Sequence, residues 1–137
     1  MVVHETASAA QAFALMTAGM VTAVGVIDGA GSLIGNLSAT DLKGLTRDAF
    51  HYLLVPVLTF LSSTYVAATA TSAIPVPRPR SNPVTVTPVA SLGFVLETMT
   101  RENLHRVWVV DSDTTRRPVG IVSMTDLIRA FTANGVA

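Results

Sequence analysis

An internal repeat constrains the fold of this chain more than any other feature of its sequence. At an offset of 83 residues, 7–17 lies on 90–100, and the apolar run that follows matches at the same offset. The second copy then has a longer turn, so the offset becomes 85 and 35–42 lies on 120–127. Both of these last stretches read G-x-h-S-x-T-D-L, where h is apolar, which indicates a duplicated structural unit.

Each copy has the same predicted order of elements: helix, strand, strand, helix. A stretch with helical spacing leads into a β-branched run, and an Asp/Gly/Ser turn then leads into a short strand. The last helix holds an Asp in its first turn. The elements are expected at 7–17, 22–27, 33–37 and around Asp41, and at 91–101, 105–110, 119–122 and around Asp126. This order predicts an α/β (α+β) fold built from two tandem repeats.

The segment between the copies has a mixed character. Residues 45–62 are expected to be helical with a kink at Pro56, and 64–83 is rich in Ala, Thr, Ser and Pro, as linkers are. The expected organisation is a first repeat at 1–48, a helix and linker at 49–83, and a second repeat at 84–133. The strand before the first helix is expected to be missing or reduced to Val2 and Val3, which is compatible with a piece of a four-repeat protein.

Composition excludes several classes of protein. Nine Lys and Arg balance nine Asp and Glu, so no net field favours nucleic acid or an anionic membrane. The longest apolar run, 52–61, is about half of the roughly 20 residues that a membrane helix needs, and it suits a buried helix or a subunit contact. The N-terminus lacks the features of a secretory signal, so an intracellular, cytoplasmic location is expected.

Catalysis is not expected. The chain has no Cys, no Gly-rich phosphate loop and no His/Asp/Glu cluster at metal-ligand spacing, and its three His are scattered. We therefore expect no catalytic residue, no metal and no cofactor.

The repeated Ser and Asp allow two interpretations. Ser38 with Asp41, and Ser123 with Asp126, have the spacing of a capping box, which needs no ligand. An ionised Asp also accepts hydrogen bonds from two vicinal hydroxyls, as on a ribose, and a helix N-terminus suits a phosphate. Capping alone explains less well why strand, Gly, Ser and Asp recur together.

At these motifs the chain resembles a known family. The stretches LIGNLSATDLKGL (33–45) and VGIVSMTDLIRAF (119–131) resemble the strand-to-helix signature of CBS domains. HRVWVVD (105–111) resembles the last repeat of AMP-activated protein kinase gamma subunits and related plant CBS proteins. The resemblance implies a Bateman module, a pseudo-twofold pair of repeats with two clefts between them.

The resemblance also implies which residues line the clefts, each cleft drawing on both repeats. One cleft would use Ser38 and Asp41 with Val84, His105 and Arg106. The other would use Ile121, Ser123, Thr125 and Asp126 with Val21, Thr22 and Ala23.

The two clefts are not equivalent, because His105 and Arg106 align with Thr22 and Ala23. Arg106 supplies a planar fork for phosphate oxygens, so the cleft of Arg106 is expected to bind phosphate more strongly. His105 supplies a donor whose charge depends on pH. The alternative is that His105 and Arg106 form a surface pair, and Trp108 fits a core or interface better than a stacking platform.

The expected function is therefore a regulatory, energy-sensor-like module that binds AMP, ADP or ATP. The alternatives are a ligand-free CBS interaction module and a module that binds S-adenosylmethionine. The expected partners are a second copy in a homodimer or other CBS repeats, together with a regulated kinase or other enzyme.

Overall fold

The structure, a computed structural model, describes residues 1–43, 45–63 and 82–133. The chain divides into two compact units, Met1–Pro83 and Val84–Ala137. Most of the predicted linker, 64–81, lies outside the described residues. Among those that are described, no helix is both long and apolar enough to cross a membrane.

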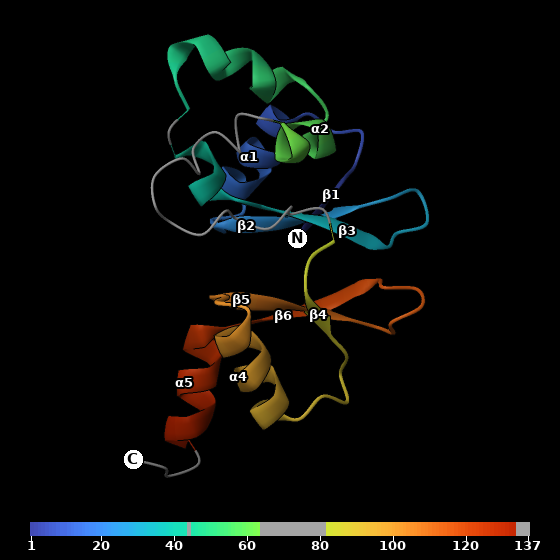
Figure 1. The fold of residues 1–137 in the computed structure, drawn as a ribbon, viewed down its shortest axis with the longest axis vertical. Coiled ribbons are helices and arrows are strands. Elements are labelled where there is room, and N and C mark those ends of the chain that lie inside the picture. The colour runs from blue at the N-terminus through green and yellow to red at the C-terminus, as the bar shows by residue number, and fades with distance from the viewer. Residues whose placement is uncertain (44, 64–81, 134–137) are drawn as a thin grey trace. The chain divides into compact units, whose positions relative to one another are not determined.

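The first unit is a three-stranded sheet with helices on one face (Figure 1). Strand β1 (Val2–His4) pairs in parallel with β2 (Ala23–Ile27), which pairs antiparallel with β3 (Leu33–Ser38). The helical elements are α1 (Ala9–Ala18), the 3₁₀ segments η1 (Ala39–Leu42) and η2 (Arg47–Leu54), and α2 (Val57–Ser62). The strand expected to be missing or reduced to two residues is thus present as β1.

The second unit has the same plan. Strand β4 (Thr85–Val86) pairs in parallel with β5 (Arg106–Val110), which pairs antiparallel with β6 (Pro118–Ser123). Helices α4 (Leu92–Arg101) and α5 (Met124–Ala133) lie on one face of this sheet (Figure 1). The predicted order of helix, strand, strand and helix, and the α+β class, are confirmed here.

The prediction for the last helix of the first repeat was wrong in its extent. Asp41 lies in η1, a single 3₁₀ turn of 4 residues, whereas Asp126 lies in the first turn of α5, a helix of 10 residues. The two sequences diverge just after the Asp. The second copy continues Ile-Arg-Ala-Phe, but the first continues Lys43-Gly44, and Gly is a poor helix former.

The two units agree in small backbone details at the offsets found in the sequence. Each sheet has a register shift at the same place, between Val26 and Ile27 and between Val109 and Val110. After the first helix of each unit, one residue adopts the left-handed conformation, namely Met20 (φ 50°) and Asn103 (φ 52°). The duplication therefore extends to individual backbone angles.

Residues 55–61 complete the core of the first unit. Pro56 is the N-cap of α2, and Val57, Phe60 and Leu61 are buried in the cluster that also holds residues of α1 and the sheet. The predicted interruption at Pro56 is confirmed, since η2 ends at Leu54 and α2 begins at Val57. The later part of this apolar run is therefore a core element of one unit, whereas Leu54 is 77% exposed.

The core of the second unit is smaller. Its buried members come from the sheet and both helices: Val86, Val95, Met99, Val107 and Leu127. Thr98 is also buried, and its hydroxyl is a polar atom without a hydrogen-bond partner among the described residues.

The left-handed conformation shared by Met20 and Asn103 can be tested by exchanging the two residue types. A left-handed conformation is costly for a side chain such as Met and better tolerated by Asn. Met20 is 93% exposed, so its side chain contributes little packing. We expect Met20→Asn to raise the free energy of unfolding by roughly 1 kcal/mol, measured by urea denaturation. The reciprocal variant Asn103→Met should lower it, and a loss of stability in Met20→Asn would contradict this reading.

Candidate functional site

The Ser–Asp motif of the second unit joins the end of β6 to the start of α5. Asp126 Oδ2 accepts hydrogen bonds from the Ser123 backbone N–H (2.8 Å) and from the Ser123 hydroxyl (2.6 Å). The Asp126 N–H donates to Ser123 Oγ (3.3 Å), which completes a reciprocal cap. Asp126 is exposed, and its Oδ1 has no hydrogen bond to any described residue. One carboxylate oxygen of an exposed side chain is therefore held in place, and the other makes no hydrogen bond to the described residues.

These contacts also set the ionisation of Asp126. The hydrogen bond from the Ser123 hydroxyl, then that from the Ser123 N–H, lower its pKa below the ordinary value of 3.8. Partial desolvation opposes them, and the charge of Arg129 adds to them. Asp126 is accordingly an anion at neutral pH.

The start of β5 lies beside this motif. Arg106 is the register partner of Ser123, and the Met124 N–H donates to the His105 carbonyl (3.0 Å). Val107, Val109 and Val122 pack in the helix-side core, so alternation along the strands places Arg106, Trp108, Ile121 and Ser123 on the opposite face of the sheet.

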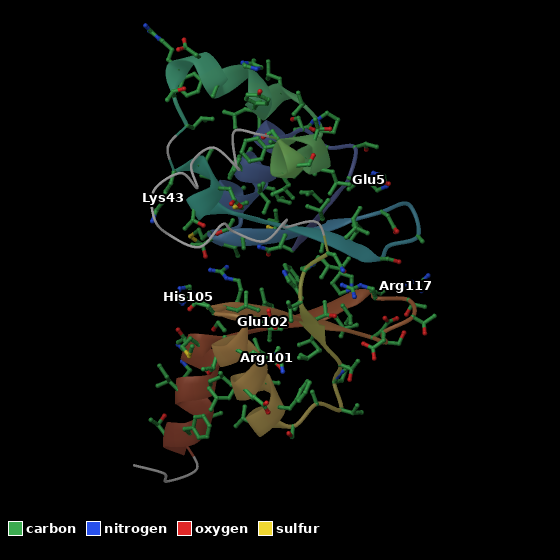
Figure 2. All side chains as sticks on the ribbon, in the orientation of Figure 1. Glu5, Lys43, Arg101, Glu102, His105 and Arg117 are labelled. Carbon is green, nitrogen blue, oxygen red and sulfur yellow. The ribbon has the colours of Figure 1, made fainter. Side chains whose placement is uncertain are left out.

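Several other predicted site residues lie nearby in the second unit. His105 and Thr125 are exposed, and Ile121 is 42% exposed. Figure 2 shows His105 at the start of β5 and Arg117 at the far end of the hairpin. Val84 is half-buried just before β4, which pairs with β5.

The corresponding motif of the first unit has similar hydrogen bonds but different exposure. Asp41 Oδ2 accepts from the Ser38 N–H (2.7 Å), and the Ser38 hydroxyl donates to the Thr22 carbonyl (3.3 Å). Ala23 is the register partner of Ser38 and is buried, while Val21 and Thr22 are exposed. Asp41 is only 6% exposed.

The capping interpretation is therefore confirmed in both motifs, and the ligand interpretation stays a prediction. Within each unit, the Ser–Asp motif lies beside the start of the preceding strand. The two motifs nevertheless differ, because Asp41 is buried beside a 3₁₀ turn and Asp126 is exposed on a helix N-terminus. Clefts that combine residues of both repeats remain a prediction. Trp108 is 5% exposed, as expected for a core or interface residue.

The Asp residues that directly follow β2 and β5 have no role predicted from the sequence, and the structure gives them one. Asp28 Oδ1 accepts from the N–H groups of Ala30 and Ser32, both at 2.9 Å. Asp111 Oδ1 accepts from the Ser112 N–H (2.7 Å), the Thr115 hydroxyl (2.7 Å) and the Arg117 N–H (2.8 Å). These residues shape the hairpin loops, and their alignment in the two copies is the signal that could have found them.

The described residues contain no group of three or more His, Cys, Asp or Glu that could hold a metal ion.

Comparison with known proteins identifies the sequence pattern. The family model described as "CBS domain" matches residues 1–47 and 72–133. Protein SDS23 from Kluyveromyces lactis is 28% identical over 119 residues, which cover 79% of this chain. The chain spans 22% of the length of that relative.

Solved structures show the same fold. CBSX2 in complex with AMP has a TM-score of 0.66 and 21% identity, covering 98% of this chain and 88% of that chain. CBSX2 from Arabidopsis thaliana has a TM-score of 0.65 and 24% identity, covering 100% and 89%. The domain pair of MJ0100, in complex with 5′-methylthioadenosine and S-adenosyl-L-methionine, has a TM-score of 0.67 and 20% identity, covering 98% and 89%.

The lowered pKa of Asp126 predicts how acid affects the second unit. A carboxyl group whose pKa falls on folding stabilises the fold above its unfolded-state pKa, and this stabilisation is lost as the pH falls through the folded-state pKa. We expect Asp126→Asn to have a lower free energy of unfolding than the parent at neutral pH. The difference between the two should shrink when the pH falls below 3.8, the ordinary pKa of an Asp. Urea denaturation over a pH series measures it.

A matched control is Asp113→Asn, in the exposed hairpin loop. This substitution removes an exposed carboxylate and leaves the hydrogen bonds between Ser123 and Asp126 in place. A stability difference for Asp126→Asn that stayed constant from neutral to acidic pH would contradict the assignment of these hydrogen bonds.

Proposed function

Since the chain belongs to the CBS domain family, we propose that it is a regulatory module that binds an adenine nucleotide and catalyses no reaction. The nucleotide would be AMP, ADP or ATP, and the module would report its level to a regulated kinase or other enzyme.

The exposed carboxylate of Asp126 is the observation that carries this proposal. Ser123 holds its Oδ2 through two hydrogen bonds, of 2.6 and 2.8 Å, so the direction of the carboxylate is fixed before any ligand binds. Oδ1 is left to accept from a ligand hydroxyl. A preorganised anion with an outward acceptor suits the vicinal hydroxyls of a ribose.

A phosphate would find donors close by. The Thr125 N–H and hydroxyl have no hydrogen bond to any described residue, and they lie in the first turn of α5, where the helix dipole favours an anion. Arg106 lies on the strand next to Ser123 and supplies positive charge and a fork of N–H donors. In the proposed nucleotide site, Asp126 takes the ribose, and Thr125 and Arg106 take the phosphate.

The related structures support an adenosine compound in general. CBSX2 was solved with AMP, and MJ0100 with 5′-methylthioadenosine and S-adenosyl-L-methionine. All of these ligands carry adenosine, but only AMP carries a phosphate. Arg106 favours the phosphate-bearing ligand over a sulfonium, because a guanidinium is attracted to one and repelled by the other.

The proposed site around Asp41 is the less accessible of the two. Its carboxylate is buried, caps its own turn, and has only a 3₁₀ segment behind it. We keep Ser38 and Asp41, with Val84, His105 and Arg106, as a second proposed site, as the family resemblance implies. Arg106 was expected only there, and we propose it for the Asp126 site as well because it is the register partner of Ser123. His105 would donate to a phosphate at the Asp41 site, and Ile121, with Thr22 and Ala23, would flank the base at the Asp126 site.

The test is calorimetric titration of the full chain with AMP, ADP, ATP, adenosine and S-adenosylmethionine. We expect AMP, ADP or ATP to bind, and Asp126→Asn to weaken every adenosine ligand by roughly tenfold or more, because a charge-assisted hydrogen bond is lost. Arg106→Gln should weaken the nucleotides and leave adenosine unchanged. To test the second proposed site, Asp41→Asn is preferable to Asp41→Ala, because the Asn side chain keeps an acceptor for the Ser38 N–H.

The outcomes separate the alternatives. Binding of S-adenosylmethionine in preference to all nucleotides would replace the phosphate assignment. No heat with any adenosine compound at millimolar concentration would favour the ligand-free interaction module. Equal affinities for the parent and for Asp126→Asn, with the fold intact, would remove Asp126 from the site.

We also propose that the chain self-associates as a homodimer through α5. Met124, Ile128 and Phe131 recur at helical spacing on this helix and are 37%, 58% and 37% exposed. An apolar stripe of this kind suits a twofold contact between copies. We expect sedimentation velocity to show a dimer that Ile128→Asp converts to a monomer, and a parent that stays monomeric at all concentrations would contradict the proposal.

A further inference from the structure

The first helix of the first unit is covered by a segment that follows the repeat. The Ala9 N–H donates to the Val55 carbonyl (3.0 Å), and the Val57 N–H donates to the Ala7 carbonyl (2.8 Å). These two hydrogen bonds form an antiparallel bridge between Ser8 and Pro56. Residues 55–61 are thereby fixed across the N-terminus of α1.

The side chains of this segment then fill the space above the sheet. A Cβ on Gly35 would lie 3.3 Å from Leu58 Cδ2 and 3.3 Å from Leu61 Cδ1, so both leucines rest directly on the backbone of β3. Phe60 packs edge-on against Phe13 of α1, with ring centroids 5.8 Å apart. Gly35, in consequence, is buried.

The second unit has the same surface, and none of the residues that the structure describes covers it in the way that residues 55–61 cover the first. Ala90 and Leu92 are the equivalents of Ala7 and Ala9, and among the described residues the Ala90 carbonyl accepts no hydrogen bond and the Leu92 N–H donates none. Gly120, the equivalent of Gly35, is exposed, and a Cβ there would meet only Val109.

At equivalent positions, side chains are more exposed in the second unit than in the first. Ala9 is fully buried, but Leu92 is 39% exposed. Val26 is fully buried, but Val109 is only half-buried. Val119 is 59% exposed beside Gly120. We call these residues of the second unit, Ala90, Leu92, Val109, Val119 and Gly120, the β6–α4 surface.

From this comparison we propose that the β6–α4 surface docks a segment of another polypeptide that has the chemistry of residues 55–61. Such a segment has an extended apolar residue, a Pro that begins a short helix, and leucines on the face of that helix. Two backbone hydrogen bonds, to Ala90 and Leu92, would fix its direction, and its leucines would cover Gly120. The first unit shows that this backbone geometry accepts such a segment.

Gly120 gives the proposal its sharpest test. Its Cβ would lie 3.6 Å from Val109 Cβ, an ordinary contact, so Gly120→Ala keeps the fold of the second unit. We expect the same of Gly120→Val, since Gly120 is exposed. The added atoms would occupy the place of the docked leucines. By contrast, Gly35→Ala meets Val26, Leu58 and Leu61 at 3.2 to 3.3 Å, so it displaces a segment that is already bound.

The probe is a fluorescent synthetic peptide of residues 49–63, titrated into the full-length chain and followed by anisotropy. We expect saturable binding, a small loss of affinity in Gly120→Ala, and a loss of roughly tenfold or more in Gly120→Val. A peptide with Leu58→Asp and Leu61→Asp should not bind. Gly29→Val, at an exposed position of the first unit where a Cβ would meet nothing within 4 Å, is the matched protein control and should leave peptide binding unchanged.

Two results would overturn the proposal. The first is the absence of saturable binding at millimolar peptide. The second is equal peptide affinity for the parent, Gly120→Ala and Gly120→Val, because the peptide would then have exchanged with residues 55–61 of the first unit or bound elsewhere. Thermal melting of each variant confirms that the fold is intact.

Discussion

The reciprocal hydrogen bonds between a Ser at the end of each hairpin and the Asp three residues later organise the rest of each repeat. They end the third strand, start the helical turn and hold it beside the preceding strand, where Thr22 and His105 supply the accepting carbonyls. Because the backbone N–H of the Ser is satisfied by a carboxylate, the strand can stop without leaving a buried donor unpaired. A carboxyl group is thereby fixed at one defined end of each sheet.

The repeat in the sequence was enough to predict the fold. The offsets of 83 and 85 residues gave the order of elements, and the structure repeats the strand pairing, the register shift and the left-handed residues Met20 and Asn103 at the same offsets. The pattern could not show that Asp41 is buried and Asp126 exposed, since burial depends on what packs around a motif rather than on the motif. It also overestimated the helix after Asp41, because a shared first turn says little about the residues that continue it.

The two units share a backbone plan but not their surroundings. Residues 55–61 cover the first sheet and bury Gly35, whereas the equivalent Gly120 is exposed. A duplicated unit can in this way hold one copy for stability and leave the other open to partners or ligands. The later part of the apolar run 52–61 stabilises the first copy, because its side chains complete the core of that unit.

The hairpin loops of the two sheets differ in what holds them, and this affects local opening. In the longer loop, Asp111 Oδ1 accepts three hydrogen bonds; those from the Thr115 hydroxyl, then from the Arg117 and Ser112 N–H groups, lower its pKa, against partial desolvation. Arg116, in the same loop, adopts a φ of 50° where the first unit has Gly31. Protonation of one carboxylate weakens three hydrogen bonds at once, next to a residue with an unfavourable backbone angle. We therefore expect the loop end of this hairpin to open more readily in acid than at neutral pH, with faster amide hydrogen exchange of the loop residues as the consequence.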